Sequence, residues 1–281
     1  MHNAMVPILA SRPATPAVAA LLAGLLLPGA ARADEEAKPA ATWEGAIGLV
    51  LRHGPTYAGA EDKRTRIAPG LFLRYGRFSV TTTGGFATRS QDETTRGGLA
   101  AELVQRDDFR VSLSLRFAGG RDPGSDPLLA GLDKRRTTLR GRLGVSRDLG
   151  AGWQLRAGWN PDLLGRDGGS YVDVGLNHGW ALTPTVQASA GIGATWSNAR
   201  YLQSYFGVSE AESARSGHPV YRPGSGLRDV GANVGLRTSF GPRWVGFANA
   251  GVSRLVGPAA DSPLTRRPSS WSLGAGLAWR F

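Results

Sequence analysis

The stretch WSLGAGLAWRF, residues 271–281, decides the fold class because its side chains alternate strictly between two faces. One face carries only apolar side chains, which are Trp271, Leu273, Ala275, Leu277, Trp279 and Phe281. The other face is small or polar, and this period of two is the pattern of an extended strand with two unlike surfaces. Tryptophan near each end of the apolar face is typical of a strand that crosses a bilayer, with aromatic rings at both interfaces.

The same alternation recurs about twelve times from Trp43 onward, which predicts an all-β chain. In residues 109–117, for example, apolar side chains alternate with arginine and serine. The expected strands are 43–52, 66–75, 78–86, 98–105, 109–117, 139–146, 153–159, 171–180, 186–196, 230–238, 244–252 and 271–281. A soluble β-sandwich would also alternate, but its apolar face would point inward and its loops would be less unequal in length, so a closed, transmembrane antiparallel β-barrel is favoured.

The connections between these strands alternate in length, which gives the expected barrel a direction. Short connections are expected at 76–77, 106–108, 148–152, 182–184 and 240–243. Long connections are expected at 53–65, 87–97, 118–137, 160–170, 197–227 and 254–270. This asymmetry is the signature of bacterial outer-membrane barrels, whose short turns face the periplasm and whose long loops are extracellular. An even number of strands then places both chain ends on the periplasmic side.

The N-terminus has the features of a secretory signal peptide. Residues 17–27 form an apolar run too short for a membrane helix, and a small-x-small cleavage pattern ends at Ala33. We therefore expect a signal peptide over 1–33, a periplasmic N-terminal tail over 34–42 and an outer-membrane barrel over 43–281. A buried helix is the alternative interpretation of the apolar run, and the true start is either Met1 or Met5.

Export and a barrel together predict a location in the outer membrane of a Gram-negative bacterium, reached by Sec-type export and cleavage near Ala33. Trp279 and Phe281 resemble the terminal signal by which such barrels are recognised for insertion, so the barrel assembly machinery is an expected partner. The chain has no cysteine, which excludes disulfides and thiolate metal sites.

The chain is strongly basic, with a formal net charge of +11, and removal of Arg12 and Arg32 with the signal peptide leaves +9. Nucleic acid, anionic lipid and anionic solutes are the usual partners of such a charge. An exported protein rarely meets nucleic acid, so lipid and solute remain. Basic residues also gather where long loops enter strands, at Lys63, Arg64, Lys134, Arg135, Arg136, Arg222, Arg228, Arg266 and Arg267. They would lie level with lipopolysaccharide phosphates, although solvated loop charge explains them equally well.

A second set of arginines lies on strand faces that are expected to point into the lumen. This candidate lumen basic cluster comprises Arg110, Arg116, Arg140, Arg142, Arg156 and Arg237. One interpretation is an anion-favouring lumen, because rings of arginine select anions in pores. The other is that these charges meet water or the fewer inward carboxylates and fill a small barrel. Those carboxylates are Glu44, Glu102, Asp173 and Asp229.

The sequence offers little support for catalysis. His53, His178 and His218 are far apart and lack the spacing of metal ligands. Ser216 and Glu212 lie near His218, but nothing marks a nucleophile. We therefore expect a non-catalytic protein without cofactor or metal, and a barrel hydrolase acting on lipid is the remote alternative.

The long loops resemble those of the MipA/OmpV family of outer-membrane proteins. The specific part contains Tyr201, Tyr205, Phe206, Gly207, Val208, Ser209, Ser216, Gly217 and Tyr221, followed by Asp261, Ser262 and Pro263. Further matches are Pro55, Tyr57, Gly59, Pro69, Gly120, Arg121, Asp126, Gly131, Leu132, His178 and Gly179. Thr56 departs from the family pattern, in which an acidic residue is expected.

The resemblance implies a scaffold that joins a lytic murein transglycosylase to a bifunctional penicillin-binding protein, or, as in other members, a porin-like protein. A standard interface needs about 800 Å² per partner, so a scaffold would use most of the periplasmic rim. The signature residues instead belong to outward loops, where Tyr205 and Phe206 could fold inward as a plug and Asp261 could pair with the basic rim. Two functions therefore stay open: a murein-enzyme scaffold, and a narrow channel or binding barrel for small anionic solutes.

Overall fold

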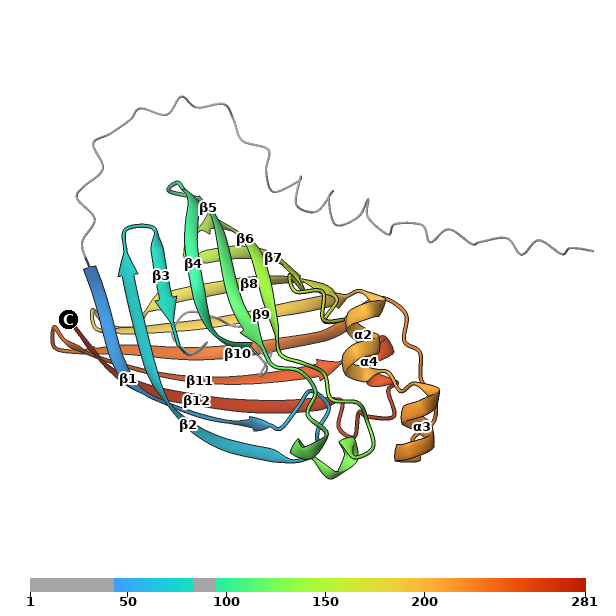
Figure 1. Cartoon of the computed structure of the whole chain (residues 1–281). Helices are drawn as coiled ribbons and strands as arrows, with labels where there is room; N and C mark the ends of the chain where they lie inside the picture. The colour runs from blue at the N-terminus through green and yellow to red at the C-terminus, as the bar shows by residue number, and fades with distance from the viewer. Residues whose placement is uncertain (1–42, 83–94) are drawn as a thin grey trace, which may run out of the picture. The chain divides into compact units, whose positions relative to one another are not determined.

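The computed structural model describes residues 43–82 and 95–281, which form a closed antiparallel barrel of twelve strands (Figure 1). The strands are β1 (Trp43–Pro55), β2 (Lys63–Tyr75), β3 (Phe78–Thr81), β4 (Thr95–Gln105), β5 (Phe109–Ala118), β6 (Thr138–Gly150), β7 (Trp153–Pro161), β8 (Ser170–Ala181), β9 (Val186–Ser197), β10 (Gly226–Phe240), β11 (Trp244–Leu255) and β12 (Ser269–Arg280). The prediction of an all-β barrel of about twelve strands is confirmed. The predicted signal peptide, the tail and the end of the third predicted strand lie outside the described residues.

The barrel closes where the first strand meets the last. Along this seam Ala46 lies opposite Arg280 and His53 lies opposite Leu273. One residue further on, the N–H of Phe281 donates to the carbonyl of Gly45 (3.0 Å), and the N–H of Gly45 donates to the carbonyl of Phe281 (3.1 Å). The seam therefore satisfies backbone groups that would otherwise form two open sheet edges.

The two faces of the strands differ as the alternation predicts. Apolar side chains on the outer face are widely exposed, for example Leu49 (61%) and Ile192 (62%). Inward positions carry mostly glycine, serine, asparagine and arginine. An outer surface this apolar suits hydrocarbon rather than water.

The connections alternate in length as expected, so one end of the barrel has short turns and the other has long loops. We call these the short-turn end and the long-loop end. Several short turns use glycine with positive φ, such as Gly76 (φ 55°) and Gly241 (φ 69°), because the tight reversal requires a backbone that other residues rarely adopt. The observed strands extend a few residues beyond the predicted ones, mostly at the long-loop end, and β6 continues to Gly150.

Aromatic side chains gather on the outer face at the short-turn end. The rings of Trp43 and Tyr75 lie 4.9 Å apart, and those of Trp153 and His178 lie 4.6 Å apart. Trp279 and Phe281, the predicted insertion signal, belong to the same belt, with centroids 5.4 Å apart. Such a belt marks one membrane interface.

The long loops contain short helices that the strand pattern did not predict (Figure 1). These are α2 (Ala199–Phe206), α3 (Glu210–Ser216), α4 (Gly257–Ala260) and two 3₁₀ turns, η1 (Pro123–Ser125) and η2 (Pro127–Leu129). Local sequence explains their bounds, because Asn198 caps α2 and Ser209 forms a capping box with Glu212 on α3. No helix in 43–82 or 95–281 is long and apolar enough to span a membrane.

About half of the buried apolar side chains in the described residues lie in the loops rather than on the strands. One cluster joins α2 and α4 to the ends of β8 and β11, and a second joins residues 129–132 to Val208 and Leu264. We call the loop segments 119–137, 198–225 and 256–268 the loop cap. A third, smaller cluster fills part of the lumen at the short-turn end, and its members are Ala46, Phe72, Val245 and Ala278.

Candidate functional site

The candidate functional site is a lumen cavity of about 340 Å³ that lies against β5 to β10. Its charged lining residues are Arg110, Arg116, Arg142, Arg156, Arg228, Asp173 and Asp229. Four of the six arginines in the candidate lumen basic cluster are thus brought together. Arg140 lies outside the lining and is 2% exposed, and Arg237 faces the lumen nearer the short-turn end.

Both cavity carboxylates are paired with arginine. Arg142 approaches Asp173 with both terminal nitrogens, and its Nη2 donates to Oδ1 at 2.7 Å. This contact depends on Gly158, since a Cβ there would lie 2.3 Å from the Arg142 guanidinium carbon. Arg228 donates from Nε to Asp229. Five arginines against two carboxylates leave the cavity with an excess of three positive charges.

On β5 to β10, inward side chains are more accessible near the short-turn end than near the long-loop end, whereas on β1, β11 and β12 the inward Ala46, Val245 and Ala278 are buried. At the long-loop end Ala118, Asn160 and Ser197 are 0%, 3% and 0% exposed. Near the short-turn end the inward-facing Arg156 and Arg237 are exposed. Because these side chains point into the barrel, the gradient means that solvent enters the lumen from the short-turn end. The cavity is therefore a cup that opens on that side.

Stacked arginine and tyrosine side chains close the long-loop end above the cavity. The guanidinium carbon of Arg140 lies 5.2 Å from the Tyr171 ring and 5.1 Å from the Tyr201 ring, and Arg228 lies 5.2 and 5.0 Å from the same rings. Arg228 also donates to the Tyr201 hydroxyl at 2.6 Å. None of these four residues is more than 8% exposed. We call them the arginine–tyrosine layer.

Arg140 holds this layer to the barrel wall through backbone carbonyls. Its Nη1 donates to Asn160 (3.3 Å) and Gly169 (3.1 Å), and its Nη2 donates to Gly168 (2.6 Å). At Gly169 the backbone has φ 57°, and a Cβ would lie 2.2 Å from the amide nitrogen of Tyr201. Glycine at this position therefore lets α2 dock directly on the β7–β8 loop.

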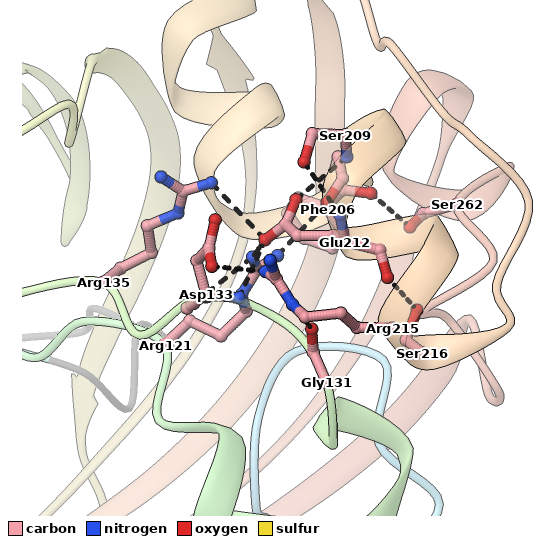
Figure 2. Close-up of polar contacts among 11 residues, drawn as sticks. Arg121, Gly131, Asp133, Arg135, Phe206, Ser209, Glu212, Arg215, Ser216 and Ser262 are labelled. Carbon is pink, nitrogen blue, oxygen red and sulfur yellow. Dashed lines mark hydrogen bonds and ion pairs between the residues drawn. The ribbon is translucent and has the colours of Figure 1, made fainter.

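A buried carboxylate joins two loops of the cap (Figure 2). Glu212 is fully buried and pairs with Arg121, which is itself 6% exposed, while Arg135 lies 3.6 Å away. Its two oxygens also accept the N–H groups of Asp133 (3.0 Å) and Ser209 (2.9 Å). We call this arrangement the Glu212 lock, because it ties the 198–225 loop to the 119–137 loop.

The hydrogen bonds of the lock stabilise the ionised form of Glu212. Burial alone would raise the pKa of Glu212, but the N–H groups of Ser209 and Asp133 and the Arg121 guanidinium outweigh it and lower that pKa. Burial lowers the pKa of Arg121, against the attraction of Glu212. The guanidinium nevertheless stays protonated because its free value is so high.

The signature residues of 198–225 build the cap rather than a separate pocket. Tyr201, Tyr205 and Phe206 pack in the cluster of α2 with Tyr171. Their sequence continues through Gly207 into Val208, which is fully buried. Further polar contacts fold this segment. Val208 and Tyr221 form two backbone hydrogen bonds of 2.9 Å, the Tyr221 hydroxyl donates to the carbonyl of Pro258 (2.8 Å), and Ser216 Oγ donates to the Glu212 carbonyl (2.7 Å).

The second signature segment pins the cap from the β11–β12 loop. The hydroxyl of Ser262 donates to the carbonyl of Phe206 at 2.6 Å and accepts the N–H of Leu264. Pro263 between them is half-buried, whereas Asp261 is exposed and joins no ion pair among the described residues. Gly217 ends α3 with φ 74°. The motif thus codes mainly for loop folding.

The residues of the remote hydrolase alternative do not form a catalytic arrangement. His218 contacts the carbonyl of Leu128 through Nε2 (2.9 Å), and Ser216 Oγ donates to a backbone carbonyl. The Glu212 carboxylate faces Arg121 instead. Within 43–82 and 95–281, no group of histidine and carboxylate side chains is placed to hold a metal ion.

The basic residues assigned to the outer rim differ in role. Lys63 lies 4.4 Å from the Trp271 ring on the outer face, and Arg267 pairs with Glu61 at 2.7 Å. Arg135 contributes to the Glu212 lock. Arg228 is not a rim residue, because it is buried in the lumen.

A β-bulge explains why the sequence pattern misplaced Arg228. Leu227 pairs with Trp196 and Asp229 with Thr195, so Arg228 is an extra residue in β10. Strict alternation counted back from Val230 would turn Arg228 outward. The adjacent charge pair with Asp229 was the one available signal of an inward position.

Comparison with known proteins identifies relatives of this chain. The chain is 27% identical over 166 residues to the MltA-interacting protein of Escherichia coli (strain K12), covering 57% of this chain and 63% of the relative. It is 26% identical over 163 residues to the outer membrane protein Omp26La of Vibrio anguillarum, covering 57% and 61%. The matched part thus spans about three-fifths of these relatives. The solved KdgM porin resembles it with TM-score 0.41 and 8% identity over 84% of this chain and 99% of that one, a similarity of fold alone.

The barrel, its apolar outer surface and its outer-membrane relatives define an integral β-barrel protein of the Gram-negative outer membrane. Its short-turn end faces the periplasm, and its long-loop end is extracellular. A family model described as MltA-interacting protein MipA matches residues 47–281. The chain belongs to this family, as its loops had suggested.

Proposed function

We propose that this protein is a non-catalytic scaffold that holds a murein-degrading lytic transglycosylase and a murein synthase at the outer membrane. The observation that supports this proposal best is the closed extracellular end. The arginine–tyrosine layer and the Glu212 lock bury the outer mouth, while the lumen and the short turns remain accessible on the periplasmic side. The name of the Escherichia coli relative agrees with a transglycosylase partner.

The periplasmic rim offers a surface of mixed character for such partners. Its exposed turns carry Arg77, Arg106, Asp107, Asp108 and Arg243. Leu149 (53%) and Leu182 (54%) are exposed beside them. Apolar anchors within a charged rim are the usual composition of a protein interface, and at about 800 Å² per partner one enzyme would occupy much of it. On the outer face, lipopolysaccharide would contact the basic loop residues, and the assembly machinery would recognise Trp279 and Phe281.

Crosslinking in living cells tests the scaffold. A photo-crosslinking residue at Arg77 or Asp107 is expected to capture a murein transglycosylase or synthase, and the same residue at the exposed extracellular Asp261 should capture neither. Charge reversal at Arg77 and Asp107 together should reduce retention of the enzyme severalfold, because rim charges steer association. Recovery of general chaperones alone from both periplasmic positions would contradict the scaffold.

The second candidate function is a narrow channel for small anionic solutes, and the excess positive charge of the cavity favours it. In the closed state that the structure shows, such a channel would have to open through the cap. Purified barrels in planar bilayers should then show anion-biased current that falls several-fold when Arg110 and Arg116, which line the cavity, are neutralised. A current unchanged in that double variant would contradict the channel hypothesis.

A further inference from the structure

We propose that the periplasm-facing cup is a binding site for the oxyanion group of a small solute, a carboxylate or a phosphate, held between Arg110 and Arg156. The site is a dead end in this structure and not a path across the membrane. It is independent of the scaffold function, because it uses the lumen and not the periplasmic rim.

The strand register places the two arginines on one level of the barrel wall. Arg110 lies opposite Ser146, and Ser146 lies opposite Arg156. Both guanidinium groups and the serine hydroxyl between them face the cavity. Two guanidinium groups therefore flank a neutral hydroxyl that can form hydrogen bonds, and this set of groups is complementary to an anion with two or three oxygens.

The same level of the wall leaves room for a ligand. The row continues from Arg156 to Gly175, Gly193 and Gly231 on β8, β9 and β10. Three inward positions without side chains lie beside the two cations, and the cavity of about 340 Å³ occupies this space. That volume lies at the lower end of the range for small-molecule sites, about 300–1,000 Å³.

The two arginines differ from Arg142 and Arg228, which also line the cavity. Arg142 and Arg228 are neutralised by Asp173 and Asp229. Arg156 donates Nε to the amide oxygen of Gln154 (2.5 Å), and no carboxylate pairs with Arg156 or Arg110 in the described part of the chain. Arg142 and Arg110 both act on Arg156 as like charges. An anion between Arg110 and Arg156 would relieve the repulsion between these two arginines, and that is the physical reason for placing the site here.

Calorimetric titration of the purified, refolded full barrel tests the site. The probes are inorganic phosphate, N-acetylmuramate, which is a carboxylate-bearing sugar of murein, and neutral N-acetylglucosamine. We expect either or both anions to bind, the neutral sugar not to bind, and affinity to fall as salt rises. The ratio of phosphate to N-acetylmuramate affinity distinguishes a phosphate source from a murein-derived carboxylate.

Variants locate the binding within the lumen. Arg110→Gln and Arg156→Gln should each weaken anion binding about tenfold or more, as expected for loss of one charge-assisted contact. Arg237→Gln is the matched control, because it removes an exposed inward arginine outside the cavity and should leave affinity within about twofold. Heat-modifiable electrophoretic mobility checks that each variant folds. Absence of anion binding by the unmodified barrel, or equal losses in R237Q and R156Q, would overturn the proposal.

Discussion

Replacement of Arg121 by methionine is expected to loosen the extracellular cap by separating its 198–225 and 119–137 loops. The substitution removes the main counter-ion of Glu212, a carboxylate that is fully buried and holds two loops together. Leaving a buried charge without its main partner costs about 3–5 kcal/mol, and Arg135, which is 3.6 Å from the carboxylate and partly exposed, replaces the lost contact only in part. Hydrogen exchange should show loss of protection in α3 and in residues 119–137, and added protease should cleave these loops in intact cells.

A matched control separates the lock from loop charge in general. Arg222 pairs with Glu210 only 2.6 Å away, but both side chains are largely exposed. Arg222→Met should therefore leave exchange and cleavage almost unchanged. Equal loosening in R121M and R222M would show that the buried Glu212 lock does not hold the cap.

The lock also predicts the pH dependence of the cap. The pKa of Glu212 is lowered in the folded cap, so its contribution to stability is complete above the ordinary pKa of a glutamate. The contribution is lost as the pH falls through the lowered folded value. Exchange protection in α3 should accordingly stay constant from neutral pH down to about 5 and decline only in more acid solution.

Replacement of Arg140 by methionine is expected to open the arginine–tyrosine layer. Arg140 donates to the carbonyls of Asn160, Gly168 and Gly169, and the change leaves all three without this buried donor. The Gly169 carbonyl keeps the N–H of Asp162 (3.1 Å), but each buried carbonyl left unsatisfied costs about 1–3 kcal/mol, so the layer should lose at least that much. In planar bilayers, R140M should show frequent open steps.

The matched variant is Arg237→Met, which removes an inward arginine that is exposed near the periplasmic end. Its bilayer record should match that of the unmodified barrel. A silent R140M barrel with full exchange protection in α2 would contradict a role for Arg140 in closing the lumen. An R140M current would also show that this arginine closes the barrel rather than selecting its ions.

The barrel could be predicted from sequence because two independent signals agree. Alternation such as that of 109–117 fixes which face of a strand is apolar, and the lopsided connections fix its direction. The loop helices could not be predicted in this way because α2 and α3 are short, and their signals are local caps rather than a long apolar period. The strand pattern also stops short of the extracellular strand ends, where buried loop contacts extend the strands.

The candidate site was only partly predictable, because alternation says that a side chain points inward but not what it meets there. Arg140 and Arg142 both face inward on β6, yet Arg140 meets loop carbonyls and Arg142 meets a carboxylate. Arg228 escaped because the bulge after Leu227 changes the strand register. The partner of Glu212 lies 91 residues away in sequence, at Arg121, and no local pattern joins them.

Labelling of a lumen cysteine from one side of the membrane shows whether the lumen is closed at its extracellular end, and the natural chain has no cysteine to interfere. Ser189 faces inward and is exposed near the periplasmic end of β9. The variant Ser189→Cys would be reconstituted in sealed liposomes with one predominant orientation and treated with a small, membrane-impermeant thiol reagent. Asp261→Cys and Asp107→Cys report the fractions of barrels whose extracellular and periplasmic ends face the reagent.

A cup closed on its extracellular side predicts that the labelled fraction of S189C equals that of D107C. A reagent that passes the cap would also label S189C in the barrels whose extracellular end faces the reagent, which D261C counts. The labelled fraction of S189C would then exceed that of D107C and approach all barrels. That result would contradict a lumen that opens only to the periplasm.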